Sequence, residues 1–122
     1  MATKRILVVD DEQPIRDLLH EALTEAGFEV HTAADSDQAL GLIRDMLFDA
    51  AILDFVLPDM NGIQLHSEIR RLDTDLAQRT LFISGVDQTD EWLKYYDDAG
   101  GFVAKPFDVA ALVAQLEELV QG

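Results

Sequence analysis

The sequence predicts an α/β domain in which five parallel strands form one sheet with helices on both faces. Four short apolar runs have the length of strands that are buried on both faces, and each ends abruptly at polar residues. Segments with apolar residues at helical spacing lie between the strands. This alternation of strand and helix favours right-handed crossovers and a parallel sheet. At 122 residues the chain has the size of one domain, which we assign to residues 1–122.

The first part of the chain is expected to form two strand–helix units. The apolar run 6–9 is the first strand, and the helix after it has Pro14 near its first turn and Gly27 at its end. Residues 28–33 form the second strand, whose greater polarity is typical of an edge strand. Asp35 is a suitable N-cap for the helix that follows.

The third strand, residues 50–54, ends at a carboxylate. The turn-forming residues 58–62 then take the chain out of the sheet, which places Asp54 at the junction of strand and loop. Apolar residues at helical spacing predict a helix over 63–72. We interpret the stretch 73–79 as a polar connection to the fourth strand.

The last part of the chain contains two further strands and two further helices. The fourth strand is the run 81–83, and the aromatic residues of segment 87–101 suggest a short helix that ends at a glycine pair. The fifth strand is the run 102–104. Asp108 is expected to cap a strong C-terminal helix with a continuous apolar stripe.

The polar residues that end these strands predict a functional site. Asp10 and Asp11 follow the first strand, Asp54 ends the third, and Ser84 and Lys105 follow the fourth and fifth. The carboxyl ends of parallel strands meet at one edge of the sheet, where ligands bind. A strand order 2-1-3-4-5 would bring the ends of the first and third strands together at the topological switch point.

The chemistry of this set favours phosphoryl transfer. Carboxylates about 4 Å apart repel each other by roughly 4 kcal/mol for each pair at an effective dielectric of about 20. Lys105 supplies one positive charge, and a hard divalent ion, Mg²⁺ or Mn²⁺, would supply the rest. A carboxylate beside such an ion, a lysine and a hydroxyl is a suitable nucleophile toward phosphorus, so Asp54 is the candidate acceptor. The chain has no cysteine, and none of its histidines lies at these strand ends, which disfavours a zinc site.

These motifs resemble those of the receiver domain of two-component response regulators, a CheY-like superfamily with a flavodoxin-like (βα)5 fold. The matching segments occur in the family's order and cover essentially the whole chain. They are Val9-Asp10-Asp11-Glu12, Asp54 with Leu57-Pro58-Asp59-Met60-Asn61-Gly62, Ile83-Ser84-Gly85, and Phe102-Val103-Ala104-Lys105-Pro106-Phe107.

The resemblance implies specific roles for the site residues. Asp54 would accept a phosphoryl group from a phosphohistidine on a histidine kinase or a histidine phosphotransfer protein. Asp10, Asp11, Asp54 and the carbonyl of Val56 would hold Mg²⁺, with Asp11 as a direct ligand and Asp10 acting through water. Lys105 would contact the phosphoryl group, and the peptide bond after it would be cis.

The resemblance also implies a switch. Ser84 would move toward the phosphoryl group, and Phe102 would turn inward behind it. The output face would consist of the helix expected within 87–101, the strand 102–104 and the C-terminal helix, and homodimers could form through the same face. Such a domain is a signalling module and not an enzyme. Its effector, and whether it stands alone or belongs to a larger regulator or hybrid kinase, are left open by the sequence.

Two apolar positions depart from the pattern of receivers that lose their phosphoryl group quickly. Val56 and Val86 lie two residues beyond Asp54 and Ser84, where such receivers carry polar groups. We expect this apolar cover to hinder the attacking water and to lengthen the life of the phosphorylated form.

Three other functions fit parts of the pattern. A phosphatase with an aspartyl intermediate would carry an Asp-x-Asp pair after the first strand, whereas the acids here are adjacent. A flavin binder would need hydroxyl groups and glycines in that loop, which is acidic here. The third alternative is a receiver fold that binds partners without phosphorylation, and the complete set of site residues argues against it.

Composition excludes several classes of partner. The net charge of −15 argues against binding to nucleic acid, which requires clustered Lys and Arg, and against binding to an anionic membrane. No apolar run approaches the roughly 18 residues that indicate a membrane helix. No secretory signal is visible, so a cytoplasmic location is expected.

Overall fold

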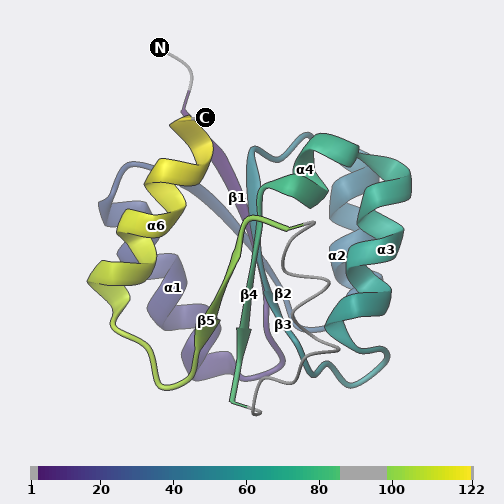
Figure 1. Cartoon of the computed structure of the whole chain (residues 1–122), viewed down its shortest axis with the longest axis horizontal. Coiled ribbons are helices and arrows are strands. Elements are labelled where there is room, and N and C mark those ends of the chain that lie inside the picture. Colours follow the sequence, from purple (N-terminus) through teal and green to yellow (C-terminus); the bar gives the residue numbers. More distant parts are fainter. Residues whose placement is uncertain (1–2, 86–98, 122) are drawn as a thin grey trace.

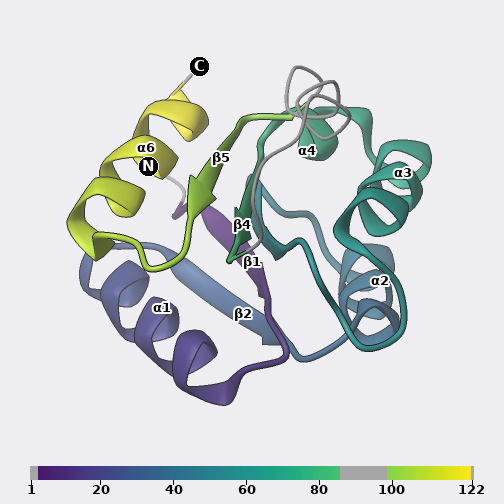
Figure 2. The ribbon, with the colours of Figure 1, turned by 60° about the horizontal axis from the view of Figure 1, so that its bottom comes forward.

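The computed structural model describes residues 3–85 and 99–121 and shows one parallel sheet between two groups of helices (Figures 1 and 2). The strands are β1 (Arg5–Val9), β2 (Glu29–Ala33), β3 (Ala50–Asp54), β4 (Thr80–Ser84) and β5 (Gly101–Ala104). The helices are α1 (Gln13–Glu25), α2 (Ser36–Asp45), α3 (Gly62–Leu72), α4 (Thr74–Gln78) and α6 (Val109–Gln121). The sheet has five strands in the order β2-β1-β3-β4-β5, which confirms the predicted fold class.

Two separate apolar cores cover the faces of the sheet, because successive strand residues point to opposite sides. Helices α1 and α6 cover one face, and α2, α3 and α4 cover the other (Figure 2). In β1, Ile6 and Val8 join the core beneath α1 and α6, whereas Leu7 and Val9 join the core on the opposite face. All four are fully buried. Burial on both sides fixes the register of the strand, since a slip by one residue would exchange the two sets of side chains.

The two outer strands are less buried than the central ones. The middle residues of β2 are only half-buried, as expected for the polar edge strand that the sequence predicts. β5 forms the opposite edge, and its first three residues are also half-buried. Among the described residues, no helix combines the length and the apolar character needed to cross a membrane.

The helix boundaries follow the predicted capping residues. The side chain of Asp35 accepts a hydrogen bond from the N–H of Gln38 at 2.8 Å at the start of α2. At the start of α6, Asp108 accepts one from the N–H of Ala110 at 2.9 Å. Gly27 follows α1 with a φ of 100°, a left-handed conformation that glycine adopts without the steric cost of a Cβ atom.

The stretch 73–79 differs from its interpretation as a polar connection. It contains the short helix α4, which Asp73 caps by accepting a hydrogen bond from the N–H of Leu76 at 3.1 Å. Leu76 and Ala77 are buried in the core beneath α2 and α3. Five residues are too few to show the apolar spacing that identifies a longer helix. The helix predicted within 87–101 rests on aromatic residues that lie outside the described part of the chain.

Candidate functional site

The register of β1 and β3 brings two acids side by side. Val9 pairs with Leu53, so Asp10 and Asp54, the next residue of each segment, are level at the carboxyl edge of the sheet. Asp10 is fully buried, and Asp54 is 6% exposed. Removing two neighbouring carboxylates from water is costly unless an opposite charge compensates them.

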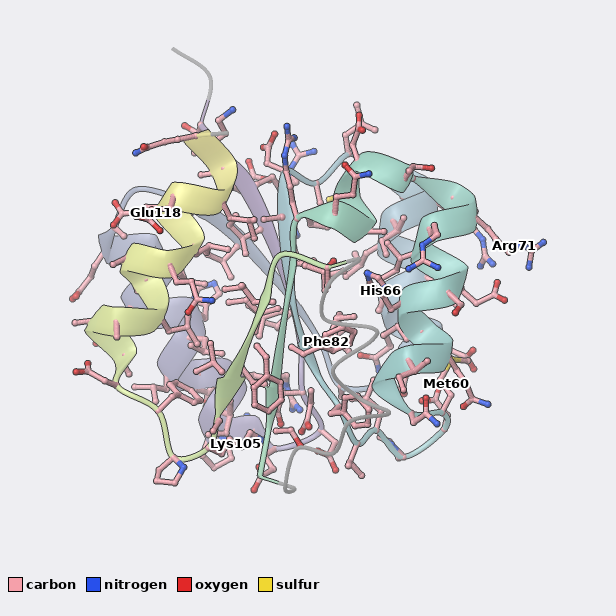
Figure 3. The ribbon with its side chains drawn as sticks, viewed as in Figure 1. Met60, His66, Arg71, Phe82, Lys105 and Glu118 are labelled. Atoms are coloured by element: carbon pink, nitrogen blue, oxygen red, sulfur yellow. The ribbon has the colours of Figure 1, made fainter. Side chains whose placement is uncertain are left out.

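Lys105 supplies that opposite charge. It follows β5, and its N–H donates a hydrogen bond to the carbonyl of Ser84 at 2.8 Å, so its side chain starts at the same edge of the sheet. Figure 3 shows Lys105 near the end of β5. Its Nζ lies 3.0 Å from Oδ2 of Asp10 and 3.1 Å from Oδ2 of Asp54. The peptide bond between Lys105 and Pro106 is cis, as predicted.

A further carboxylate joins this cluster. Oε2 of Glu12 lies 3.0 Å from Nζ of Lys105, and oxygens of Asp10, Glu12 and Asp54 lie within 4.8 Å of one another. The sequence pointed to Asp11 instead of Glu12. Asp11 is exposed and does not belong to this group of oxygens, so its role as a direct metal ligand stays a prediction.

Burial and the charges of the cluster shift the pKa values of Asp54 and Lys105. Burial raises the pKa of Asp54, the hydrogen bond from the N–H of Val56 at 3.1 Å lowers it, and the charge of Asp10 raises it again, with a net rise. Burial also favours the neutral amine of Lys105. Its contacts with Asp10, Glu12 and Asp54 outweigh that effect and raise the pKa of Lys105, so the lysine stays charged.

The donor set fits a hard divalent cation. Three carboxylates face one ammonium group, which leaves the cluster with excess negative charge. Oδ2 of Asp10 is buried and, apart from its ion pair with Lys105, accepts no hydrogen bond from the described residues. Carboxylate oxygens are the ligands that Mg²⁺ and Mn²⁺ prefer. Ligation by the carbonyl of Val56 stays a prediction.

The loop after β3 is fixed from two sides. The N–H of Gly62 donates a hydrogen bond to the carbonyl of Phe55 at 2.6 Å, and a Cβ atom at Gly62 would lie only 2.9 Å from the Cα of Phe55. The carboxylate of Asp59 accepts hydrogen bonds from the N–H groups of Ser36 at 3.1 Å and Asp37 at 3.2 Å. The end of β3 is therefore held against the first turns of α2 and α3.

The two predicted switch residues lie on the neighbouring strands β4 and β5. Ser84 ends β4 and is 1% exposed. Phe102 is half-buried and pairs with Phe82, which lies at the centre of the sheet in Figure 3. The ring of Phe82 packs edge-on against that of Phe55, with centroids 5.8 Å apart. Through Phe82, packing thus links Phe102 to Phe55, the residue after Asp54. The movements of Ser84 and Phe102 stay predictions.

An open apolar groove of about 380 Å³ borders the site. It is lined by Ile15 and Leu18 of α1 and by Lys105, Pro106 and Phe107 after β5. Lys105 belongs to both the groove and the acid cluster, so the two are adjacent. This groove could not be predicted from the sequence, since its walls come from distant segments and its residues follow no common pattern.

Comparisons with known proteins agree with this geometry. The model of the response regulator receiver domain matches residues 6–117. The uncharacterised transcriptional regulatory protein YrkP of Bacillus subtilis is 40% identical over 113 residues, which are 92% of this chain and 47% of that protein. The phosphate regulon transcriptional regulatory protein PhoB of Pseudomonas aeruginosa is 32% identical over 122 residues, 99% of this chain and 53% of that protein. The chain spans about half the length of these relatives.

Solved structures show the same fold. A CheY-like response regulator receiver domain protein from Methanospirillum hungatei has a TM-score of 0.91 at 28% identity, covering 98% of this chain and 95% of that one. The response regulator TrrA from Thermotoga maritima, in complex with Mg²⁺ and BeF, has a TM-score of 0.85 at 33% identity, covering 96% and 99%. Nearly all of the chain thus matches one family in sequence and in fold, and the chain belongs to the receiver domains of two-component response regulators.

Proposed function

We propose that this receiver is a phosphoacceptor switch in which Asp54 takes a phosphoryl group from a phosphohistidine of a histidine kinase or a histidine phosphotransfer protein. One observation carries the proposal: the buried carboxylate of Asp54 lies beside that of Asp10 and 3.1 Å from the ammonium group of Lys105. Accepting a phosphoryl group is the general role of the family.

The transfer is a displacement at phosphorus. An oxygen of Asp54 forms a new bond to phosphorus while the N–P bond of the phosphohistidine breaks, and the imidazole leaves with the electron pair of that bond and takes up a proton. The ammonium group of Lys105 neutralises part of the charge on the transferring group. Asp11, Asp54 and the carbonyl of Val56, with Asp10 acting through water, would hold Mg²⁺, and the ion would supply additional positive charge to the phosphoryl oxygens.

The phosphoryl group then biases a conformational equilibrium. The hydroxyl of Ser84 donates a hydrogen bond to a phosphoryl oxygen, and Phe102 turns inward behind it. These contacts exist only in the phosphorylated state, so they favour one of two conformations. The change reaches the described part of the output face, β5 and α6, where an effector or a second copy of the domain binds, while the helix predicted within 87–101 lies outside the described residues.

The apolar groove beside the site supports a protein donor. A phosphohistidine must reach an acid at the carboxyl edge of the sheet, so its carrier has to pack on the surface around that edge. The groove provides an apolar surface there, and Leu18, a large apolar residue, is 42% exposed beside it. An apolar helix that carries the histidine is the partner surface that this groove fits.

The test is the intact mass of the protein after incubation with Mg²⁺ and a small-molecule acyl phosphate. A gain of one phosphoryl group in the wild type, absent in Asp54→Asn and without metal, is the expected result. Asp75→Asn, which removes an exposed acid at α4, is the matched control and should behave as the wild type does. A folded wild type that gains no mass would favour the alternative of partner binding without phosphorylation.

A further inference from the structure

The ammonium group of Lys105 already donates hydrogen bonds to Glu12 and Asp54 and forms an ion pair with Asp10 before any phosphoryl group arrives. It has three N–H donors and faces three carboxylates, at 3.0 Å from Asp10, 3.0 Å from Glu12 and 3.1 Å from Asp54. A phosphoryl oxygen that contacts Lys105 therefore competes with these carboxylates for the ammonium group.

The three carboxylates differ in how easily they can give up their contact with Lys105. The Asp10 side chain is fully buried, and its Oδ1 also accepts a hydrogen bond from the N–H of Glu12 at 2.8 Å. The Asp54 side chain is 8% exposed and is the acceptor itself. The Glu12 side chain is 59% exposed, so water replaces the lost partner when Glu12 moves. A buried carboxylate that lost its partner would have no such compensation.

The position of Glu12 at the start of α1 also indicates that its side chain is directed to Lys105 and not to the helix. It is the N-cap of α1, where Ser, Thr, Asp or Asn would satisfy a free N–H, but its side chain makes no capping hydrogen bond. The side chain reaches Lys105 instead, 93 residues away in sequence. Capping therefore does not account for the direction of this side chain, whereas the ion pair does.

We propose that Glu12 is a displaceable counterion of Lys105, which holds the contact that a phosphoryl oxygen takes on transfer. The inference rests on the proposed function, and it makes Glu12 a positioning residue that acts through Lys105. Because the Glu12 contact must break on the way to the phosphorylated state, neutralising Glu12 accelerates phosphorylation.

The experiment compares Glu12→Gln with Glu21→Gln, which removes the same charge from an exposed position on α1. Phosphorylation by an acyl phosphate at saturating Mg²⁺ is followed by intact mass. Glu12→Gln should react about two- to fivefold faster than wild type, the range expected for loss of one exposed ion pair. Glu21→Gln should stay close to the wild type. High salt should reduce the gain, because it screens an exposed pair.

A second measurement examines the contact without any reaction. NMR of the Lys105 side-chain ammonium in the free protein should show faster hydrogen exchange with water in Glu12→Gln and no change in Glu21→Gln. An unchanged Lys105 signal in Glu12→Gln would overturn the inference, whatever the result of the phosphorylation assay.

The outcomes separate this inference from the proposed function. A wild type that gains no phosphoryl group would contradict the proposed function and, with it, the role of Glu12. A wild type that reacts, with Glu12→Gln no faster than Glu21→Gln, would overturn the role of Glu12 alone. Slower reaction of Glu12→Gln together with weaker Mg²⁺ binding by calorimetry would assign Glu12 to the metal and overturn its role as a counterion.

Discussion

Asp54 and Asp10 are buried side by side, and a single ammonium group faces both of them. The site therefore contains more negative charge than the protein alone compensates. Burial and the charge of Asp10 raise the pKa of Asp54, so the folded state binds the Asp54 proton more tightly than the unfolded chain does. The ionised carboxylate thus disfavours folding above its raised pKa, and this cost is absent below the pKa of the unfolded chain.

Asp54→Asn should consequently stabilise the protein at neutral pH in the presence of a chelator. We expect the unfolding temperature to rise by a few degrees, since about 1 kcal/mol corresponds to roughly 3–6 °C for a domain of this size. The difference should shrink as the pH falls toward the ordinary pKa of aspartate. Thermal unfolding followed by circular dichroism checks this, with Asp75→Asn as the control. An unchanged or lower unfolding temperature of Asp54→Asn at neutral pH would contradict the prediction.

A divalent cation should relieve the same excess of negative charge. Millimolar Mg²⁺ is expected to raise the unfolding temperature of the wild type, because an ion that binds the folded state stabilises it by mass action. Asp10→Asn should reduce this rise, since the substitution removes a buried carboxylate of the site. Sodium chloride at equal ionic strength is the control. A rise of equal size in Asp10→Asn would show that Mg²⁺ acts elsewhere.

The exposed side chain of Val56 lies two residues beyond Asp54, and we expect it to lengthen the half-life of the phosphorylated form. It is 55% exposed, and its N–H donates to the carboxylate of Asp54. Val56→Asn should shorten the half-life of the phosphorylated protein, because a polar group can orient the attacking water. Leu47→Asn changes another exposed apolar residue away from the site and should leave the half-life unchanged. An equal half-life in both variants would refute the protective role of Val56. Val86, the second residue predicted to shield the phosphoryl group, lies outside the described residues.

Most of the site could be predicted from residues at strand ends, because the topology of a parallel sheet brings those positions together. The buried pair of Asp10 and Asp54 and the approach of Lys105 follow from strand register alone. Glu12 could not be selected in this way. It lies beyond the strand, and whether its side chain points to solvent, to the helix or to Lys105 depends on its rotamer and on a partner 93 residues away.

At the junction between β3 and α3, the backbone of Gly62 lies close against that of Phe55. Gly62→Ala should lower the free energy of unfolding by about 1–3 kcal/mol, because its Cβ would meet the backbone of Phe55 at 2.9 Å, and backbone cannot move aside as a side chain can. Gly41→Ala is the matched control. Its Cβ would meet nothing within 4 Å, so it should stabilise α2 by about 0.5–1 kcal/mol. Urea unfolding measures both, and effects of the same sign would contradict this account.

Some helices and strands can be predicted from the sequence more easily than others. Long amphipathic segments and buried apolar runs identified β1, β3, β4, α1 and α6 because many residues share one period. The helix α4 was missed, since its five residues carry only two buried apolar side chains. The one local signal was Asp73, three residues before Leu76, which is the spacing of a capping interaction.

The arrangement of the whole molecule places the apolar groove at the same edge as the acid cluster. Leu18→Glu should slow transfer from a phosphohistidine protein that phosphorylates the wild type, because it puts a charge on the surface proposed to receive the donor. The rate with a small acyl phosphate should change little. Leu47→Glu, at an exposed apolar residue elsewhere, is the control. Equal slowing with both donors would show that Leu18 supports the site itself and not the docking of a partner.

The ion pairs of Lys105 join residues that are far apart along the chain. Lys105 meets Asp54 across 51 residues and Glu12 across 93, and contacts between residues so far apart in sequence form slowly because long loops must close first. A chain that is still being synthesised, or that has misfolded, therefore lacks the contact between Asp54 and Lys105. Under the proposed function, the phosphoacceptor site is therefore complete only after β5 has docked, so a chain that has not finished folding would not be phosphorylated.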